Sequence, residues 1–216
     1  MIHSQTRFIR YNAAIATPIQ PVTATLFGKY QREPAWRPIR QLRHVKLEPK
    51  LAQWLFDSSS LTTRLKHACT AAFSVQILQE GWARPMLNEA ERLGMRPSSY
   101  AWIRQVHLLC GDQAWVFART VIPPHTLRGK QRRLARLGKK PLGAVLFADK
   151  SMQRTEMEIA DIRAGQPLFE LATHHRAPPA QSIWGRRSVF FLNRKPLLVS
   201  EIFLPEIGDP VHTQLR

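Results

Sequence analysis

A charged residue interrupts the apolar face of a predicted strand at residues 100–110. Strand alternation gives that face four members, one of them charged: Trp102, Arg104, Val106 and Leu108. Burying a guanidinium without a partner is costly, so the pattern predicts that an anionic group meets Arg104. The alternative is an arginine on an edge strand, whose stem packs while its charged end reaches water.

The last predicted strand, residues 197–204, has a matching irregularity. Both of its faces are largely apolar, so Glu201 is shielded whichever face turns inward. A shielded carboxylate pairs with a cation or has a raised pKa. Either state suits acid–base catalysis or the recognition of a hydroxyl group. The structural alternative is an ion pair of Glu201 with Arg104 or Arg119.

A third charge lies in the neighbouring strand pattern, residues 114–122. Arg119 shares a face there with three apolar residues, Trp115 among them. Two arginines that face one glutamate would leave room for an anionic ligand. We therefore predict a pocket with Arg104 and Glu201, and with Arg119 as a candidate source of added positive field. The pattern alone does not identify the ligand.

Other reactive residue types give weaker signals. His174 and His175 are adjacent, but no acid or cysteine lies at ligand spacing, so a solvated loop pair is favoured over a metal site. Cys69 and Cys110 lie far apart in the sequence and indicate neither a disulfide framework nor a zinc site. Cys110 fits a core position better than a nucleophile. We expect no bound metal and a reducing, cytoplasmic setting.

Hydrophobic periodicity predicts the elements that position these residues. The first half reads as helices near 47–55 and 58–68, a strand at 73–77, a polar helix or loop at 86–96, and a hairpin of strands at 100–110 and 114–122. The second half reads as helices at 126–137 and 141–149, a strand at 155–162, a long loop at 164–180 and a final hairpin at 184–204. Hairpins in place of β-α-β crossovers predict an antiparallel sheet with helices packed on it, an α+β domain.

The charge balance narrows the classes of partner. The chain has 32 lysines and arginines against 15 acids, a net charge of +17. Such a balance favours phosphates, acidic membranes or small anions. Residues 128–140 form the densest basic run. A solvated helix face is favoured there over nucleic-acid binding, because no helix-turn-helix, RNP or zinc-finger pattern accompanies the run. No stretch reaches the roughly 18 apolar residues of a membrane helix.

Residues 1–40 differ from the rest of the chain. They contain a single acid, Glu33, with scattered arginines, four prolines and little periodicity. We predict a poorly ordered basic extension over residues 1–40 and one domain over residues 41–216. A dispensable tail or an over-extended start site is favoured over an organelle transit peptide.

A series of short motifs runs through residues 41–205. They are, in order, Trp54-Leu55, residues 57–65 (DSSSLTTRL), 102–104 (WIR), 108–110 (LLC), 118–123 (ARTVIP), 137–143 (LGKKPLG), 146–147 (LF), 184–188 (WGRRS), 195–198 (KPLL) and 201–205 (EIFLP). In this order they resemble the bacterial chorismate pyruvate-lyase family, which catalyses the first committed step of ubiquinone biosynthesis. No motif is decisive alone, but their colinear order makes the resemblance specific.

The resemblance implies a fold and a set of contacts. The fold is a six-stranded antiparallel sheet with helical flaps over an internal ligand site. Arg104 matches the arginine that holds a ring carboxylate, and Glu201 matches a glutamate near the ring hydroxyl. Leu61 and Leu142 match contacts made by the two flaps. The family usually has methionine at the position of Leu61, which is also apolar and of similar volume.

The activity implied by the resemblance is cleavage of chorismate to 4-hydroxybenzoate and pyruvate. We expect a monomer without a cofactor. Aromatisation drives this reaction, so the protein need only orient the ether and screen two carboxylates. Glu201 would bind the hydroxyl or transfer a proton.

Two other functions compete with this one. The first is a ligand-sensing domain of the same fold without catalysis. Such a domain would have an attached winged-helix DNA reader, for which residues 1–40 are too short and proline-rich. The second is a basic nucleic-acid-binding protein, which would show strongly salt-dependent binding to DNA or RNA.

Overall fold

Six longer strands form one antiparallel sheet in the computed structural model, which describes residues 32–41, 47–173 and 181–209. Their spatial order is β6 (Glu158–Arg163), β7 (Ser182–Leu192), β8 (Lys195–Phe203), β4 (Gln113–Ile122), β3 (Ala101–Cys110) and β2 (Phe73–Ala83). Two strands of two residues extend it, since β1 (Arg37–Pro38) pairs with β6 and β5 (Gln153–Arg154) pairs with β7. The predicted α+β class is confirmed, with these two short strands added to the six.

Tight turns close the two hairpins that carry the predicted site residues. Gly111 has a φ of 56° between β3 and β4, and Asn193 and Arg194 have φ values of 50° and 62° between β7 and β8. Left-handed backbone matches the twist of paired strands, and glycine and asparagine adopt it at low cost. The turn residues in the sequence therefore fix which strands become neighbours.

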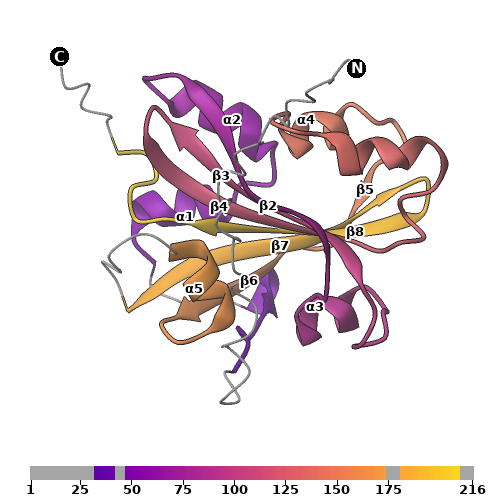
Figure 1. Cartoon of the computed structure of the whole chain (residues 1–216). Coiled ribbons are helices and arrows are strands. Elements are labelled where there is room, and N and C mark those ends of the chain that lie inside the picture. The colour runs from indigo at the N-terminus through magenta and orange to yellow at the C-terminus, as the bar shows by residue number, and fades with distance from the viewer. Residues whose placement is uncertain (1–31, 42–46, 174–180, 210–216) are drawn as a thin grey trace, which may run out of the picture. The chain divides into compact units, whose positions relative to one another are not determined.

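Helices lie on both faces of the sheet (Figure 1). One face, which we call the pocket face, is covered by α2 (Leu61–Ala68), the 3-10 helix η2 (Gly129–Arg136) and α4 (Leu142–Phe147). The other, which we call the rear face, is covered by α3 (Leu87–Arg92) and α5 (Pro167–Thr173). No helix among the described residues is long and apolar enough to cross a membrane.

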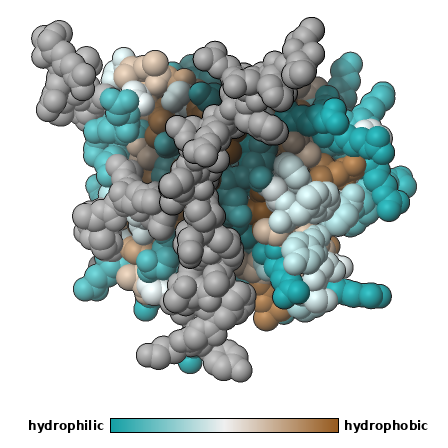
Figure 2. Space-filling view, in the orientation of Figure 1, coloured by the Kyte–Doolittle hydropathy of each residue, from teal (hydrophilic) through white to brown (hydrophobic). Residues whose placement is uncertain are grey.

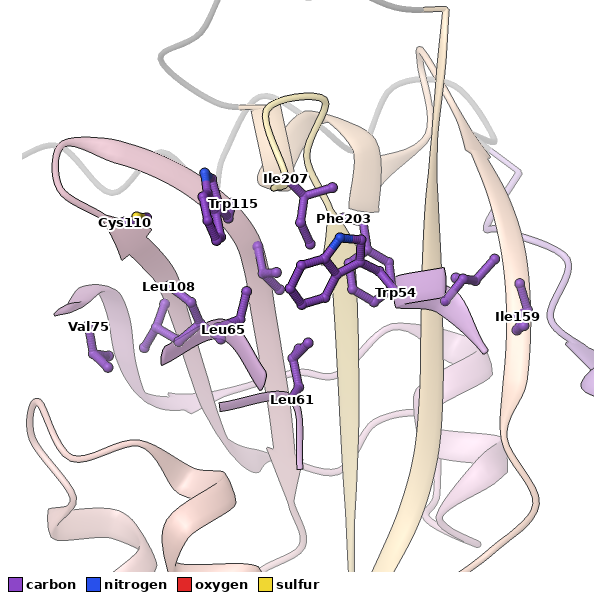
Figure 3. Close-up of a cluster of buried hydrophobic side chains, with 13 residues drawn as sticks. Trp54, Leu61, Leu65, Val75, Leu108, Cys110, Trp115, Ile159, Phe203 and Ile207 are labelled. Carbon is purple, nitrogen blue, oxygen red and sulfur yellow. The ribbon is translucent and has the colours of Figure 1, made fainter. Parts of the chain in front are cut away.

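An apolar cluster attaches the first two helices to the pocket face (Figure 3). Trp54 of α1 (Pro49–Leu55) and Leu65 of α2 are almost fully buried in it, against Leu108 and Phe203 of the sheet. These helices have the predicted positions because their apolar residues recur at helical spacing. The flap that α2 forms therefore rests on a packed core.

Trp115 departs from the predicted alternation. The register between β3 and β4 shifts between Leu108 and Leu109, which is a bulge. Trp115 consequently packs in the cluster of Figure 3, with its ring centroid 6.4 Å from that of Trp54, while Phe117 belongs to the rear-face core. An extra residue in one strand reverses the alternation, and the sequence gives no sign of it.

Two predicted segments need correction. The loop predicted at residues 164–180 contains α5, whose apolar residues cover the rear face. The helix predicted at residues 126–137 is the shorter η2. His174 and His175 lie outside the described residues.

The predicted boundary after residue 40 is too late. Glu33 accepts hydrogen bonds from the backbone N–H groups of Leu87 and Asn88, both at 2.8 Å, at the start of α3. Trp36 packs over the guanidinium of Arg187, and β1 pairs with β6. Residues 32–40 are therefore part of the domain, although their prolines and weak periodicity suggested a tail.

Cys69 and Cys110 form a disulfide, contrary to the prediction from their spacing. Cys69 follows α2 directly, and Cys110 ends β3. Pairing of Phe73 with Cys110 brings the two segments together. A separation of 41 residues in sequence carries no information about this proximity, because strand pairing creates it.

Exposed cations gather on the segment that joins β4 to α4. Lys130, Arg132, Arg136, Lys139 and Lys140 all have exposed side chains. Hydrophilic residues predominate along the right-hand margin in Figure 2, where this segment lies in Figure 1. The basic run is a solvated surface, as its pattern indicated.

Candidate active site

A pocket lies between the pocket face of the sheet and the α2 and α4 flaps. The empty space of the pocket together with open solvent at its mouth amounts to about 590 Å³. Apolar lining comes from both flaps and from the sheet: Leu61, Val106, Leu108, Leu142, Leu146, Phe147, Phe190 and Val199. Four charged residues also line it: Arg104, Arg154, Arg186 and Glu201. A mostly apolar pocket with a few convergent charges is the usual form of a small-molecule site.

Arg104 is buried on β3, with its side chain only 3% exposed. Its Nη2 donates to the carbonyls of Gly138 at 2.7 Å and Lys140 at 3.3 Å, and Glu80 lies 3.4 Å from its Nε. Burial lowers the pKa of the guanidinium, and Glu80 opposes this effect. Within the described part of the chain, neither Nε nor Nη1 has a hydrogen-bond partner. Arg104 can therefore still donate to an anion in the pocket.

Glu201 is held by Arg186 of the adjacent strand β7. Arg186 Nε donates to Glu201 Oε2 at 2.6 Å, and its Nη1 donates to the carbonyls of Trp54, at 3.0 Å, and Asp57. The Glu201 side chain is 20% exposed and that of Arg186 only 1%. The alternative considered from the sequence, an ion pair with Arg104 or Arg119, is not formed, because strand pairing places Arg186 directly opposite Glu201.

The sheet register sets the spacing between Arg104 and Glu201. Arg104 pairs with Thr120 and Glu201 with Ala118, so both side chains face the pocket. The two residues are two strands apart across the sheet and two residues apart along it. Ideal strand spacing makes these offsets about 10 Å and about 7 Å. Both side chains line the pocket, so a ligand that reaches both needs polar groups at two separate ends.

Arg119 does not join this pocket. It extends from the rear face, where its Nε and Nη2 donate to Glu89 Oε1 and Oε2 at 2.7 and 3.0 Å. Both side chains are at most 5% exposed. Arg119 alternates with the pocket-facing Ala118 and Thr120 along β4, so its charge is neutralised on the other side of the sheet.

The two flaps approach each other closely at Gly143. A Cβ added to Gly143 of the α4 flap would lie 2.9 Å from Thr62 Oγ1 of the α2 flap, so glycine permits this approach. Asp57 fixes the turn before α2 by accepting from Ser59 N and Arg64 Nη1, both at 2.7 Å. Burial raises the pKa of Asp57, but the hydrogen bonds from Ser59 and Arg64 outweigh it and lower that pKa overall.

Sequence comparison decides the family. The chorismate lyase family matches residues 31–213. A probable chorismate pyruvate-lyase from Methylococcus capsulatus is 40% identical over 73% of this chain and 96% of its own length. One from Pseudomonas aeruginosa is 37% identical over 81% of this chain and 93% of its own. The chain belongs to the chorismate lyase family.

Solved structures resemble this chorismate lyase family member more distantly. The ligand-binding domain of a putative GntR-family transcriptional regulator from Bordetella bronchiseptica is 15% identical and covers 68% of this chain and 91% of its own, with a TM-score of 0.46. A likeness of this degree gives no indication of function.

Four of the five predicted site residues lie together in this family member. Arg104 and Glu201 come from the sheet, Leu61 begins α2 and Leu142 begins α4. Arg154 and Arg186 were not predicted. Arg186 lies within the WGRRS motif, which could have indicated it, whereas Arg154 lies on a two-residue strand without any periodicity. Among the described residues, no three His, Cys, Asp or Glu side chains are grouped to hold a metal.

Proposed function

We propose that this protein is a chorismate pyruvate-lyase, which converts chorismate to 4-hydroxybenzoate and pyruvate. The observation that supports this best is the pocket itself, where Arg104 and Glu201 face inward from two strands among apolar side chains. Membership of the chorismate lyase family supports the same reaction. The product would supply ubiquinone biosynthesis.

Arg104 would bind the ring carboxylate of chorismate. Its unused donors suit a charge-assisted pair with a carboxylate, and its two carbonyl contacts hold the guanidinium in place. Leu61 and Leu142 would close over the ring from the two flaps, where both side chains are already buried. Exclusion of water by these flaps would strengthen the arginine–carboxylate pair.

The reaction rearranges atoms already present in chorismate. The bond between a ring carbon and the ether oxygen breaks, and its electron pair leaves with enolpyruvate. The neighbouring ring carbon, which bears the hydroxyl group, loses its hydrogen as a proton, and the C–H pair completes the aromatic ring. A proton added to the enolpyruvate methylene carbon yields pyruvate. The sum is redox-neutral, so orientation and electrostatic stabilisation suffice and we expect no cofactor.

Glu201 would act at the hydroxyl end of the ring. Arg186 occupies its Oε2, which orients the carboxylate and leaves Oε1 to accept from the substrate hydroxyl. In one version of the mechanism, Glu201 only holds this hydroxyl and the proton passes within the substrate. In the other, Glu201 carries the proton to the methylene carbon.

A cytoplasmic monomer is the form that we propose. The substrate is a dianion that does not cross a lipid bilayer unaided, which favours the compartment where it is made. Size-exclusion chromatography with light scattering tests the monomer directly.

One assay tests the proposed activity. Purified protein is incubated with chorismate and EDTA, with and without dithiothreitol, and 4-hydroxybenzoate and pyruvate are quantified. We expect equal amounts of both products under every condition. Chorismate binding without turnover would instead favour a ligand-sensing domain. Activity that EDTA abolishes and zinc or magnesium restores would contradict cofactor-free catalysis.

A further inference from the structure

Chorismate has a second carboxylate, on the enolpyruvyl group, which leaves with pyruvate. If the proposed function holds, the pocket must accommodate this charge as well as the ring carboxylate. Arg119, the candidate from the sequence, is paired with Glu89 on the rear face. Two unpredicted arginines, Arg154 and Arg186, line the pocket instead.

Arg186 is not available for a second anion. Its Nε is bonded to Glu201, its Nη1 to two backbone carbonyls, and its guanidinium lies 5.4 Å from the ring centroid of Phe203. Its side chain is 1% exposed. These contacts make Arg186 a positioning residue for Glu201 and for the turn between α1 and α2.

Arg154 has weaker partners. Its Nε donates to Ser188 Oγ and its Nη1 to the carbonyl of Ser58, each at 3.0 Å, while among the described residues its Nη2 meets only the thioether sulfur of Met157 at 3.6 Å. A thioether is a weak acceptor, so one side of this guanidinium lacks a strong partner. Burial lowers the pKa of Arg154, and the charge of Glu201 opposes that effect. A carboxylate beside Arg154 would offset the cost of burying this cation.

The position of Arg154 matches the geometry of the substrate. The strands run in the order β3, β4, β8, β7, with β5 on the far side of β7, so Arg104 and Arg154 lie on opposite sides of the strand that bears Glu201. In chorismate the enolpyruvyl ether is attached next to the carbon that bears the hydroxyl group, and the ring carboxylate is at the far end. With the hydroxyl at Glu201 and the ring carboxylate at Arg104, one of the two orientations of the ring about this axis directs the second carboxylate toward Arg154.

We propose that Arg154 binds the enolpyruvyl carboxylate of the substrate. The carbonyl of Ser58, which precedes the α2 flap, and the hydroxyl of Ser188 on β7 hold the guanidinium at the pocket wall. Phe190 lies against it with a ring centroid 5.1 Å away. Arg104 thus serves substrate and product alike, whereas Arg154 serves only the substrate.

Arg154→Gln separates these two roles, because 4-hydroxybenzoate lacks the enolpyruvyl carboxylate. Loss of a charge-assisted pair should lower kcat/KM for chorismate by about 30-fold or more, with the Kd of 4-hydroxybenzoate changed by less than about threefold. Arg96→Gln, which removes the same charge from an exposed loop residue, is the control and should change neither quantity. Unchanged kcat/KM in Arg154→Gln would overturn the proposal. An equal loss of substrate and product binding would overturn it too, since it would show a collapsed pocket.

A second variant covers the case in which Arg154→Gln does not fold. Arg154→Lys keeps the charge without the planar fork and should lower kcat/KM by about tenfold with product affinity intact. Wild-type kcat/KM in Arg154→Lys, with Arg154→Gln unfolded, would assign Arg154 to structure alone. Absence of 4-hydroxybenzoate formation by the wild-type protein would be a failure of the proposed function. Failure of the Arg154 proposal gives a different result, an active wild-type protein whose kcat/KM is unchanged in Arg154→Gln.

Discussion

Buried arginines on the two faces of the sheet have different partners. On the rear face, Arg119 makes two hydrogen bonds to Glu89, and Arg187 donates to Glu158 at 2.7 Å and to Asn88 at 2.6 Å. On the pocket face, Arg104 and Arg154 are held by carbonyl, hydroxyl and sulfur acceptors, with charged carboxylates at longer range. Arg186 on the pocket face also completes an ion pair, with Glu201. Arg104 and Arg154 differ from it and from the rear-face arginines, because they are left able to bind an anion.

The difference shows what a buried arginine in a strand can and cannot indicate. Burial alone is common to both faces, since Arg104, Arg119 and Arg187 are all at most 6% exposed. Carboxylates supplied by α3 and β6 neutralise the rear-face pair. The pocket face obtains backbone carbonyls from the η2–α4 connection and the loop before α2, which orient a guanidinium without neutralising it. The role of each buried arginine therefore depends on the groups that it contacts. Substitution should lower stability most on the rear face and ligand affinity or activity most in the pocket.

The largest effect should come from Arg119→Ala. It leaves the buried Glu89 carboxylate unpaired, which should reduce the free energy of unfolding by about 3–5 kcal/mol. Denaturant unfolding measures this loss. Arg119→Met combined with Glu89→Leu should recover most of it, because both charges are then absent. Wild-type stability of Arg119→Ala would contradict the structural role that we assign to the buried arginine of the rear face.

Glu201→Gln tests the pocket face next. If Glu201 transfers a proton, the single-turnover rate should fall roughly 10²-fold with the affinity for 4-hydroxybenzoate nearly kept. If Glu201 only holds the hydroxyl, the rate should fall much less. Measuring single-turnover rate beside product affinity separates the two mechanisms. A rate and an affinity both equal to wild type would exclude Glu201 from the site.

Two truncations test whether residues 32–40 are part of the domain. Deleting residues 1–30, which lie outside the family match, should leave stability and kcat/KM unchanged. Deleting residues 1–40 also removes Glu33 and Trp36 and should cost about 2 kcal/mol of stability, through the lost hydrogen bonds to α3 and the lost packing on Arg187. Equal stability of the two truncated proteins would contradict the placement of residues 32–40 in the domain.

The smallest effect concerns Asp57 in the α2 flap. Its pKa is lowered in the folded protein, so its ionised form stabilises the fold above about pH 4 and this contribution is lost as the pH falls through the folded-state pKa. Asp57→Asn should therefore cost about 1 kcal/mol at pH 7 and less at pH 3. Unfolding curves at both pH values test this. A stability cost of Asp57→Asn that is larger at pH 3 than at pH 7 would contradict the prediction.

The sequence predicted the elements that depend on local pattern and failed where distant segments meet. Helical spacing of Leu61 and Leu65 and alternation around Arg104 and Glu201 predicted α2 and the site strands, and the resemblance to a family supplied the roles. The bulge at Trp115 reversed one face, which no periodicity indicates.

Long-range pairing accounts for the other misses. Cys69 and Cys110 meet because β2 pairs with β3, and Arg186 faces Glu201 because β7 pairs with β8. Arg119 was misplaced for the same reason, since its partner Glu89 comes from a helix packed on the rear face.

Arg104→Ala is the measurement that tests the central claim most directly. The affinity for 4-hydroxybenzoate should fall by about 2–5 kcal/mol, because the carboxylate loses its charged partner, while the free energy of unfolding falls by less than it does in Arg119→Ala. Arg104→Lys should recover only part of the affinity, because a point charge does not reproduce the planar fork. Calorimetric titration with 4-hydroxybenzoate and denaturant unfolding of the same preparations give both quantities. Wild-type product affinity in Arg104→Ala would contradict the site described for the pocket face.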